Sequence, residues 1–260
     1  MDIKKENDTA IADVIERDPF GLFCGTREMA AAQIEQHIPR NTIPWVLNVE
    51  CGTGDTILRL AKIWSKALYY GLDISSMRLK ICRDKLIQQG IKATLKTGDI
   101  HHLGDFARPE IFDLVVLHYV WGCCGVRPIL ADIFDIVQKG GYISIVTATY
   151  EAFVKLQNLS ASFLPPKRLQ SLRAIPANQK VALEDVRASG LEIVEQNTFE
   201  RECVFQNFDE LYDFGMNSDW LSSYFEAMSD EKLDAARKMP HLFPITDIFK
   251  ATVILARKKQ

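Results

Sequence analysis

The chain has 260 residues, of which 47% are hydrophobic and 25% charged, and its net charge at pH 7 is −3. This composition is typical of a globular protein, because it is too apolar for disorder and no apolar run is long enough to span a bilayer. The 31 basic and 34 acidic residues form no strong basic stripe, which disfavours nucleic acid as the main partner. Residues 1–18 are too polar and acidic for a secretory or organellar signal, so we expect a cytoplasmic protein without membrane attachment.

The six cysteines form no CxxC pair and no Cys/His cluster with metal-binding spacing. They therefore predict neither a disulfide framework nor a zinc site. Cys123 and Cys124 are adjacent and raise the alternative of a soft metal or metalloid, but the side chains of neighbouring residues diverge. We expect reduced thiols and no metal.

Strand-like and helix-like patterns alternate from residue 45 onward, as in a parallel sheet that is covered by helices. The helix at 76–89 has a good N-cap in Ser76 and is followed by Gly90, a favourable residue after a helix. In chain order, we expect a strand at 45–49, a helix at 55–66, a strand at 67–72, the helix at 76–89, strands at 93–97 and 112–120, a helix at 128–138 and a strand at 142–149.

Beyond residue 150 this alternation weakens. A helix is expected at 180–189, a strand at 191–199 and a last strand at 251–257. The roughly fifty residues between the two strands are too many for a hairpin turn and look helical in part. They predict a cap that is inserted between the last two strands.

The segment VLNVECGTGD, residues 46–55, leads a strand into a glycine turn and then a helix. Gly52 and Gly54 stand where the backbone passes close to a ligand and where helix N–H groups point at it. A dinucleotide fingerprint would need a third glycine at the position of Ile57. The YxxxK pair of many reductases is also missing, because the lysine after Tyr150 comes five residues later. Nicotinamide binding is therefore the weaker interpretation.

Two acidic residues follow at the tips of the next two strands, Asp73 and Asp99. Strand tips of this kind lie side by side at the carboxyl edge of a sheet, where open α/β folds bind ligands. The first carboxylate can accept the hydroxyls of a ribose and the second an adenine amino group, while Ile74, Met77 and Ile100 cover the faces of the ring. The alternative is that both acids only cap the helices that follow them.

In their order and spacing these motifs resemble the class I S-adenosylmethionine-dependent methyltransferases that modify small molecules. The resemblance covers residues 20–150 and, more loosely, the last strand. It implies an α/β fold: a Rossmann-like, seven-stranded, mostly parallel sheet with an antiparallel last strand, helices on both faces and a helical cap insert. The implied domains are an N-terminal helical lid at 1–40, a cofactor-binding domain at 41–200 and 250–260, and an aromatic-rich cap at 201–249.

The resemblance implies S-adenosylmethionine as the cofactor. His118 and Tyr119, at the exit of the fourth strand, are the candidates for the catalytic base, and His118 has a cofactor-packing or structural role as its alternative. The residues expected to contact the cofactor are Glu50, Cys51, Gly52, Gly54, Asp73, Ile74, Met77, Asp99, Ile100 and His118.

Aromatic residues concentrate in the predicted cap and suggest an apolar acceptor pocket, although some of these rings must simply pack the cap. No NPPY type of motif, which would resemble nucleic-acid amino methyltransferases, follows the fourth strand. We therefore predict methyl transfer to O or N of a small, partly apolar molecule by a monomer or homodimer. A catalytically silent protein of this fold and a nucleotide-dependent oxidoreductase are the alternatives. The residues expected at the acceptor are Phe20, Phe23, Tyr150, Trp220 and Tyr224.

Two positions of the loop depart from the family pattern, which has an acid at the position of Asn48 and glycine at that of Glu50. The Glu50 carboxylate either repels the cofactor's carboxylate or pairs with its ammonium, whereas Asn48 can donate hydrogen bonds but brings no charge. We expect the loop to bind the cofactor less tightly than the usual loop and Glu50→Gly to hold or improve the affinity. Asp73→Ala should weaken cofactor binding without impairing folding.

Overall fold

A computed structural model describes residues 14–105, 108–120, 127–149, 151–162, 178–217, 222–226 and 228–259. The chain forms two compact units. The first, called the sheet unit, comprises Cys24–Ala148, Asn178–Phe199 and Ala251–Gln260. The other, called the second unit, draws on the described parts of Met1–Phe23, Thr149–Ala177 and Glu200–Lys250.

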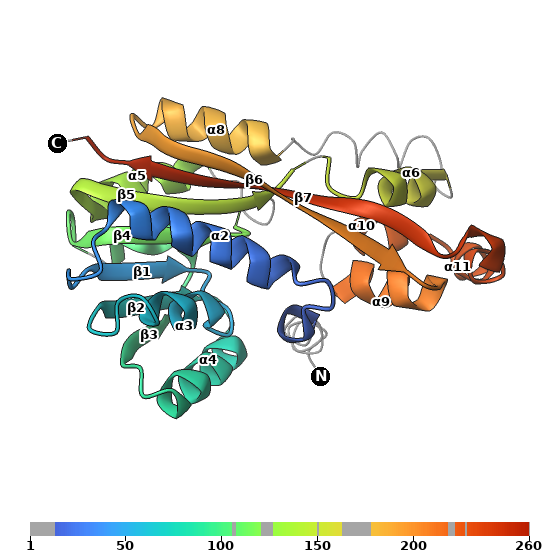
Figure 1. The fold of residues 1–260 in the computed structure, drawn as a ribbon, viewed down its shortest axis with the longest axis horizontal. Helices are drawn as coiled ribbons and strands as arrows, with labels where there is room; N and C mark the ends of the chain where they lie inside the picture. Colours follow the sequence, from blue (N-terminus) through green and yellow to red (C-terminus); the bar gives the residue numbers. More distant parts are fainter. Residues whose placement is uncertain are drawn as a thin grey trace. The chain divides into compact units, whose positions relative to one another are not determined.

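Seven strands form one sheet in the order β3-β2-β1-β4-β5-β7-β6 (Figure 1). Neighbours among β1 to β5 pair in parallel, and β7 pairs antiparallel with β5. The predicted mostly parallel, seven-stranded sheet with an antiparallel last strand is thereby confirmed. The strands are β1 (Trp45–Val49), β2 (Leu68–Asp73), β3 (Ala93–Thr97), β4 (Phe112–His118), β5 (Val137–Ala148), β6 (Glu192–Phe205) and β7 (Ile245–Arg257).

Helices cover both faces of this sheet. Consecutive residues of each strand point to opposite faces, and both faces are buried. On β4, Leu114 and Val116 are buried in the apolar cluster to which α2, α3 and α4 contribute. Val115 and Leu117 are buried in the other cluster, to which α5 and α8 contribute. The helices of the sheet unit are α2 (Leu22–His37, whose first two residues belong to the second unit), α3 (Asp55–Ala61), α4 (Ser76–Gln88), the 3₁₀ helix η1 (Ile100–Asp105), α5 (Arg127–Ile136) and α8 (Asn178–Ala188).

Several element boundaries differ from the sequence prediction. The largest differences are in the last two strands: β6 runs on to Phe205 instead of residue 199, and β7 begins at Ile245 instead of residue 251. Helix α3 ends at Ala61 instead of residue 66. The N-cap of α4 is Ser75 and not Ser76, and its hydroxyl accepts a hydrogen bond from the backbone N–H of Arg78 at 3.3 Å. Strand β5 begins five residues earlier than expected, at Val137, because the strand continues through two glycines alongside β4 with a shift of register.

The second unit has an aromatic core. The ring centroids of Phe205 and Phe214 lie 5.3 Å apart, and Phe153 packs edge-on against Phe214 at 5.6 Å. Its helices are α6 (Val154–Ser162), α9 (Phe208–Asn217), α10 (Ser222–Phe225), α11 (Asp230–Arg237) and η2 (Pro240–Leu242). The region between β6 and β7 is thus helical, as the sequence predicts.

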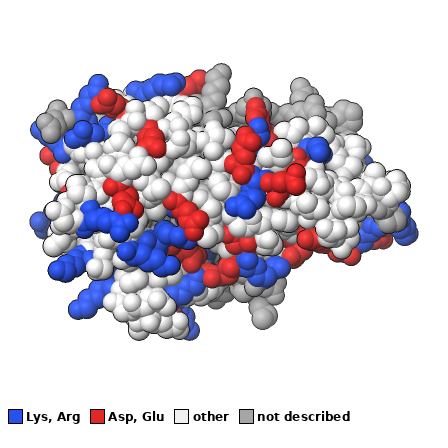
Figure 2. Space-filling model, viewed as in Figure 1, with Lys and Arg blue, Asp and Glu red and all other residues white. Residues whose placement is uncertain are grey.

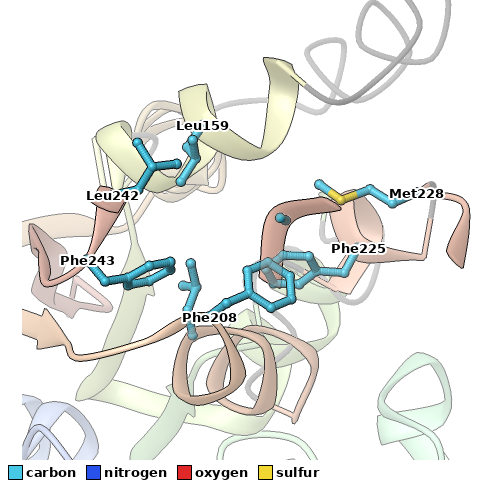
Figure 3. A pocket seen from close by; sticks show the side chains of 8 residues that line it. Leu159, Phe208, Phe225, Met228, Leu242 and Phe243 are labelled. Atoms are coloured by element: carbon cyan, nitrogen blue, oxygen red, sulfur yellow. The ribbon is translucent and has the colours of Figure 1, made fainter. Parts of the chain in front are cut away.

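A small apolar cavity lies among the helices of the second unit, where Phe208, Phe225 and Phe243 face one another (Figure 3). Its volume of about 10 Å³ is close to the room that one water molecule needs. In this arrangement of the described side chains the cavity is too small for an organic ligand. Its walls are Leu159, Phe208, Leu211, Phe225, Met228, Ala236, Leu242 and Phe243.

Acidic and basic side chains lie interspersed on the face of the molecule that Figure 2 shows. Among the described residues, Arg59 Nη1 pairs with Glu28 Oε1 at 2.9 Å in the sheet unit. None of the helices in the described ranges combines the length and the apolar character that crossing a bilayer requires.

Candidate cofactor site

The carboxyl ends of three neighbouring strands meet at the segment that follows β1. Asn48 of β1 stands opposite Gly71 of β2 on one side and Val116 of β4 on the other. The backbone N–H of Cys51 then donates to the carbonyl of Leu72 at 2.9 Å, which extends the pairing into the loop. This is the edge at which open parallel sheets bind ligands.

The loop between β1 and α3 has three residues with positive φ: Glu50 at 51°, Gly52 at 55° and Gly54 at 91°. A Cβ at Gly54 would lie 2.5 Å from the Sγ of Cys82, so glycine lets the loop pack directly against α4. A Cβ at Gly52 would meet no described atom within 4 Å. The loop therefore presents backbone to open space at Gly52 while it is tightly packed at Gly54.

Asp73, the last residue of β2, is fully buried and bonded within the protein. Its Oδ2 accepts from the backbone N–H of Gly52 at 2.7 Å, and its Oδ1 accepts from the N–H of Ser75 at 2.8 Å. The guanidinium of Arg78 lies 3.1 Å from the same Oδ1. This carboxylate thus ties the glycine loop, the end of β2 and the start of α4 together.

Glu50 lies beside this cluster, with its Oε2 4.0 Å from Nη2 of Arg78 and a side chain that is 20% exposed. Burial raises the pKa of Glu50 to about 7; the charges of Asp73 and Asp99 act in the same direction, and that of Arg78 opposes them. Glu50 is therefore divided between its neutral and charged forms near neutral pH.

A second charged cluster holds the start of α3. Asp55 accepts from the Nζ of Lys85 at 3.0 Å and from the hydroxyl of Thr53 at 3.0 Å, and Arg27 of α2 lies 3.9 Å away. Burial alone would raise the pKa of Asp55, but Arg27 and Lys85 outweigh it and the pKa is lowered. The negative charge in the first turn also suits the helix dipole, so the cluster fixes α3 between α2 and α4.

The residues predicted around the adenine have different environments. Ile74 is 60% exposed and Met77 is half-buried, so both remain available to cover a ring. Ile100 is 1% exposed and belongs to the sheet core. Asp99 accepts from the backbone N–H of His101 at 2.9 Å and so caps η1, in line with the capping alternative for this residue.

His118 and Tyr119 end β4. The Nε2 of His118 lies 3.1 Å from the hydroxyl of Ser144, and its Nδ1 has no partner among the described residues. Burial, aided by Arg27, lowers the pKa of His118 to about 3. The ring is therefore neutral at physiological pH and a weak base. Tyr119 has a φ of 62°, and its hydroxyl lies 2.8 Å from that of Thr26.

The residues predicted at the acceptor are only partly described. Phe20 belongs to the second unit, where its ring packs edge-on against that of Phe205 at 4.9 Å. Phe23 belongs to the same unit and is 5% exposed. Tyr150 and Trp220 lie outside the described residues, and of Tyr224 only the place in α10 is described.

Sequence reasoning missed Arg78, Arg27 and Lys85. Arg78 leaves a signal in the sequence: it is the third residue of α4, in a first turn without acids, where a cation opposes the helix dipole. A basic residue at such a position indicates a carboxylate nearby. Arg27 and Lys85 leave no such signal, since their partner Asp55 is brought to them only by the fold.

His118 and Glu50 should make opposite contributions to the pH dependence of the protein's free energy of unfolding. The folded-state pKa of His118 is about 3 against an ordinary 6.5, so its contribution is present above pH 6.5 and is lost as the pH falls toward 3. The folded-state pKa of Glu50 is about 7 against an ordinary 4.5, so its contribution is present below pH 4.5 and is lost as the pH rises toward 7.

In urea unfolding measured from pH 3 to 8, His118→Gln should flatten the acid limb and Glu50→Gln the limb between pH 4.5 and 7. Each change in slope should amount to at most about 1.4 kcal/mol per pH unit. A variant whose curve runs parallel to that of the wild type would show that the group does not titrate as its burial requires.

The chain is similar to known proteins in part of its sequence and in its fold. Residues 46–141 match the sequence model of a family described as "Methyltransferase domain". No curated protein matches the chain. A solved structure of a candidate methyltransferase from Bacillus halodurans superposes with a TM-score of 0.62 at 16% identity, covering 88% of this chain and 99% of the other.

Two further solved structures have the same fold. Phosphoethanolamine N-methyltransferase 2 of Haemonchus contortus, in complex with phosphomonomethylethanolamine and S-adenosylhomocysteine, gives a TM-score of 0.55 at 14% identity, over 90% of this chain and 53% of that one. A [4+2]-cyclase gives 0.56 at 16% identity, over 88% and 79%. Residues 46–141 thus match a methyltransferase domain in sequence, and the chain has the fold of the class I S-adenosylmethionine-dependent methyltransferases.

Proposed function

We propose that this protein is an enzyme that transfers the methyl group of S-adenosylmethionine to O or N of a small, partly apolar molecule. The observation that carries the proposal is the methyltransferase-domain match, which spans the glycine loop, Asp73 and Asp99. A structural neighbour solved with S-adenosylhomocysteine supports the cofactor. We propose further that the protein acts in the cytoplasm, as a monomer or homodimer, without nucleic acid as a partner.

The residues at the carboxyl edge fit this cofactor. The open space at Gly52 leaves room for a ligand against the backbone, as a Cβ there would meet nothing within 4 Å. Glu50, Cys51 and Gly52 would hold its methionine part, Asp73 its ribose, and Ile74 and Met77 its adenine. Asp99 and His118 would also contact the cofactor, whereas Ile100 would support the site from the sheet core. When bound, the cofactor supplies an electrophilic methyl group on a sulfonium.

The protein's own part is mainly to position the acceptor and, where needed, to accept its proton. With a pKa of about 3, His118 suits a hydrogen-bonding role better than that of a base. Tyr119 is the alternative group for contact with the acceptor, because the hydrogen bond between its hydroxyl and that of Thr26 fixes its side chain. We propose these two residues as the groups nearest the transferred methyl.

We expect Trp220→Ala or Tyr224→Ala to impair turnover while leaving affinity for S-adenosylhomocysteine nearly intact, because we propose that the aromatic second unit shapes the acceptor pocket. Turnover is followed as tritium transfer from labelled S-adenosylmethionine to a panel of small phenols and amines. Phe225→Ala is the packing control: Phe225 is 2% exposed and should cost about 3–5 kcal/mol of stability. Equal loss of turnover and cofactor affinity, with a lower melting temperature, would make the two rings packing residues as well.

A catalytically silent protein of the same fold is the second candidate function. Two observations favour it: Asp73 is already bonded to Arg78, and Glu50 stands in the loop with a strained φ of 51°. The [4+2]-cyclase among the neighbours illustrates that this fold also carries other reactions. A nucleotide-dependent oxidoreductase is a third and weaker candidate, because Ile57, fully buried, stands where its fingerprint needs glycine.

Calorimetric titration with S-adenosylmethionine, S-adenosylhomocysteine and NADH separates these functions. A methyltransferase should bind the first two and not NADH. Binding of both without methyl transfer to any acceptor of the panel would favour the silent protein. Tight binding of NADH alone would overturn the proposal.

A further inference from the structure

Arg78 holds two carboxylates of the proposed site at once. Its Nη2 lies 3.1 Å from Asp73 Oδ1 and 4.0 Å from Glu50 Oε2. The side chain of Arg78 is 20% exposed and that of Asp73 is fully buried, so solvent screens this pair little. Because the nearer partner is Asp73, the guanidinium pairs with the acid that recognition of a ribose needs.

A bond to Arg78 and full recognition of a ribose by Asp73 exclude each other. A carboxylate offers about four lone-pair positions for hydrogen bonds. At least three are taken, by the N–H groups of Gly52 and Ser75 and by Arg78. Two ribose hydroxyls need two positions, so at most one of them finds room. The two backbone N–H groups are fixed by the turn, whereas the long side chain of Arg78 can move.

Glu50 is the acceptor to which Arg78 can move. Its backbone has a φ of 51°, which a residue other than glycine adopts only at a cost. Its side chain is 20% exposed, and its Oε2 lies 4.0 Å from Nη2 of Arg78, the nitrogen that also contacts Asp73. A short shift of the guanidinium therefore exchanges one carboxylate for the other.

We propose that Arg78 exchanges Asp73 for Glu50 when the nucleoside of the cofactor binds, so that Glu50 is the positioning residue that opens Asp73 to the ribose. This inference rests on the proposed function, because the ligand is the cofactor of that reaction. The sequence led us to expect that Glu50 weakens cofactor binding, and the exchange predicts the opposite effect. Glu50 strengthens binding because it accepts Arg78, and without Glu50 the guanidinium stays on Asp73.

The exchange also predicts release of a proton. Asp73, Asp99 and Arg78 are the charged groups that face Glu50: burial and the two acids raise its pKa to about 7, whereas Arg78 lowers it. Pairing with Arg78 favours the ionised form, so Glu50 should give up a fraction of a proton for each cofactor bound at pH 7. A residue that only supports the loop would not produce this release.

The test is calorimetric titration of the full chain with S-adenosylhomocysteine at pH 7, in phosphate and in Tris. These buffers differ in ionisation enthalpy, so the comparison counts the protons released. Arg78→Met should lower Kd about tenfold and Glu50→Gln should raise it about tenfold. In the Arg78→Met background, Glu50→Gln should have no further effect. Arg83→Met, at an exposed position of the same helix, is the matched control and should leave Kd unchanged.

Proton release should be found in the wild type and be absent from Glu50→Gln and Arg78→Met. Weaker or unchanged binding by Arg78→Met, tighter binding by Glu50→Gln, or equal proton counts in all variants would overturn the exchange. Should Arg78→Met fail to fold, Glu50→Gln still tests it, because that variant keeps the Asp73–Arg78 pair.

The outcomes also separate this inference from the proposed function. Binding by the wild type without the expected variant effects overturns the exchange alone. Binding by Arg78→Met but not by the wild type overturns the exchange, because Arg78 then stays on Asp73, and leaves the proposed cofactor in place. Binding by neither protein overturns both.

Discussion

Asp73→Ala is expected to lower the free energy of unfolding by about 3–5 kcal/mol, the usual cost of removing one partner of a buried ion pair. The substitution leaves the guanidinium of Arg78 without its nearest carboxylate. It also leaves the N–H groups of Gly52 and Ser75 without the acceptor that the fully buried carboxylate of Asp73 provides. The sequence alone suggested that folding would be unaffected; full burial of Asp73 changes that expectation.

Urea unfolding measures this loss, and Asp84→Ala, at an exposed position of α4, is the control. Where the variant is still folded, its affinity for S-adenosylhomocysteine should fall by a further 1.5–3 kcal/mol or about 10- to 150-fold, the range for hydrogen bonds to a charged group. Loss of stability with unchanged affinity would assign Asp73 to the loop and remove it from the ribose.

The fold of the sheet unit was predictable because its determinants are local. Strands β1 to β4 begin and end within two residues of the prediction, since short apolar runs between turn residues leave little choice of register. The glycines at 52 and 54 follow β1 directly and adopt the positive φ that their place in the turn requires. The seven-stranded sheet with its antiparallel last strand was expected from the family resemblance, and the order of the strands comes from the structure.

The partners of the site residues were not predictable in the same way. Asp73 was recognised by its place at a strand tip, but its bond to Arg78 depends on how α4 is rotated. Likewise, His118 has an ordinary sequence context, and its burial, aided by the charge of Arg27, lowers its pKa. Such contacts join side chains whose orientations are set by packing. The spacing of residues in one sequence does not reveal these orientations.

Gly54→Ala is expected to destabilise the protein by about 2–5 kcal/mol. The left-handed φ of 91° costs an L-residue roughly 1–2 kcal/mol. The new methyl group would also lie 2.5 Å from the Sγ of Cys82, and relief of such overpacking costs about 1–3 kcal/mol. Urea unfolding of Gly54→Ala, Cys82→Ala and the double variant measures the two parts. The double variant should recover the overpacking part, while strictly additive effects would contradict the contact.

Gly52→Ala is the matched substitution in the same loop. We expect it to affect cofactor binding more than the stability of the fold. Its φ of 55° should cost only about 1–2 kcal/mol, because the new methyl group meets no described atom within 4 Å. That open space is where we propose that the cofactor lies against the backbone, so the methyl group should weaken S-adenosylhomocysteine binding at least tenfold, or about 1.4 kcal/mol. Gly54→Ala should thus act mainly on folding and Gly52→Ala mainly on binding. If Gly52→Ala bound the cofactor normally, the ligand would not approach this side of the loop, and the strand tips would need another occupant.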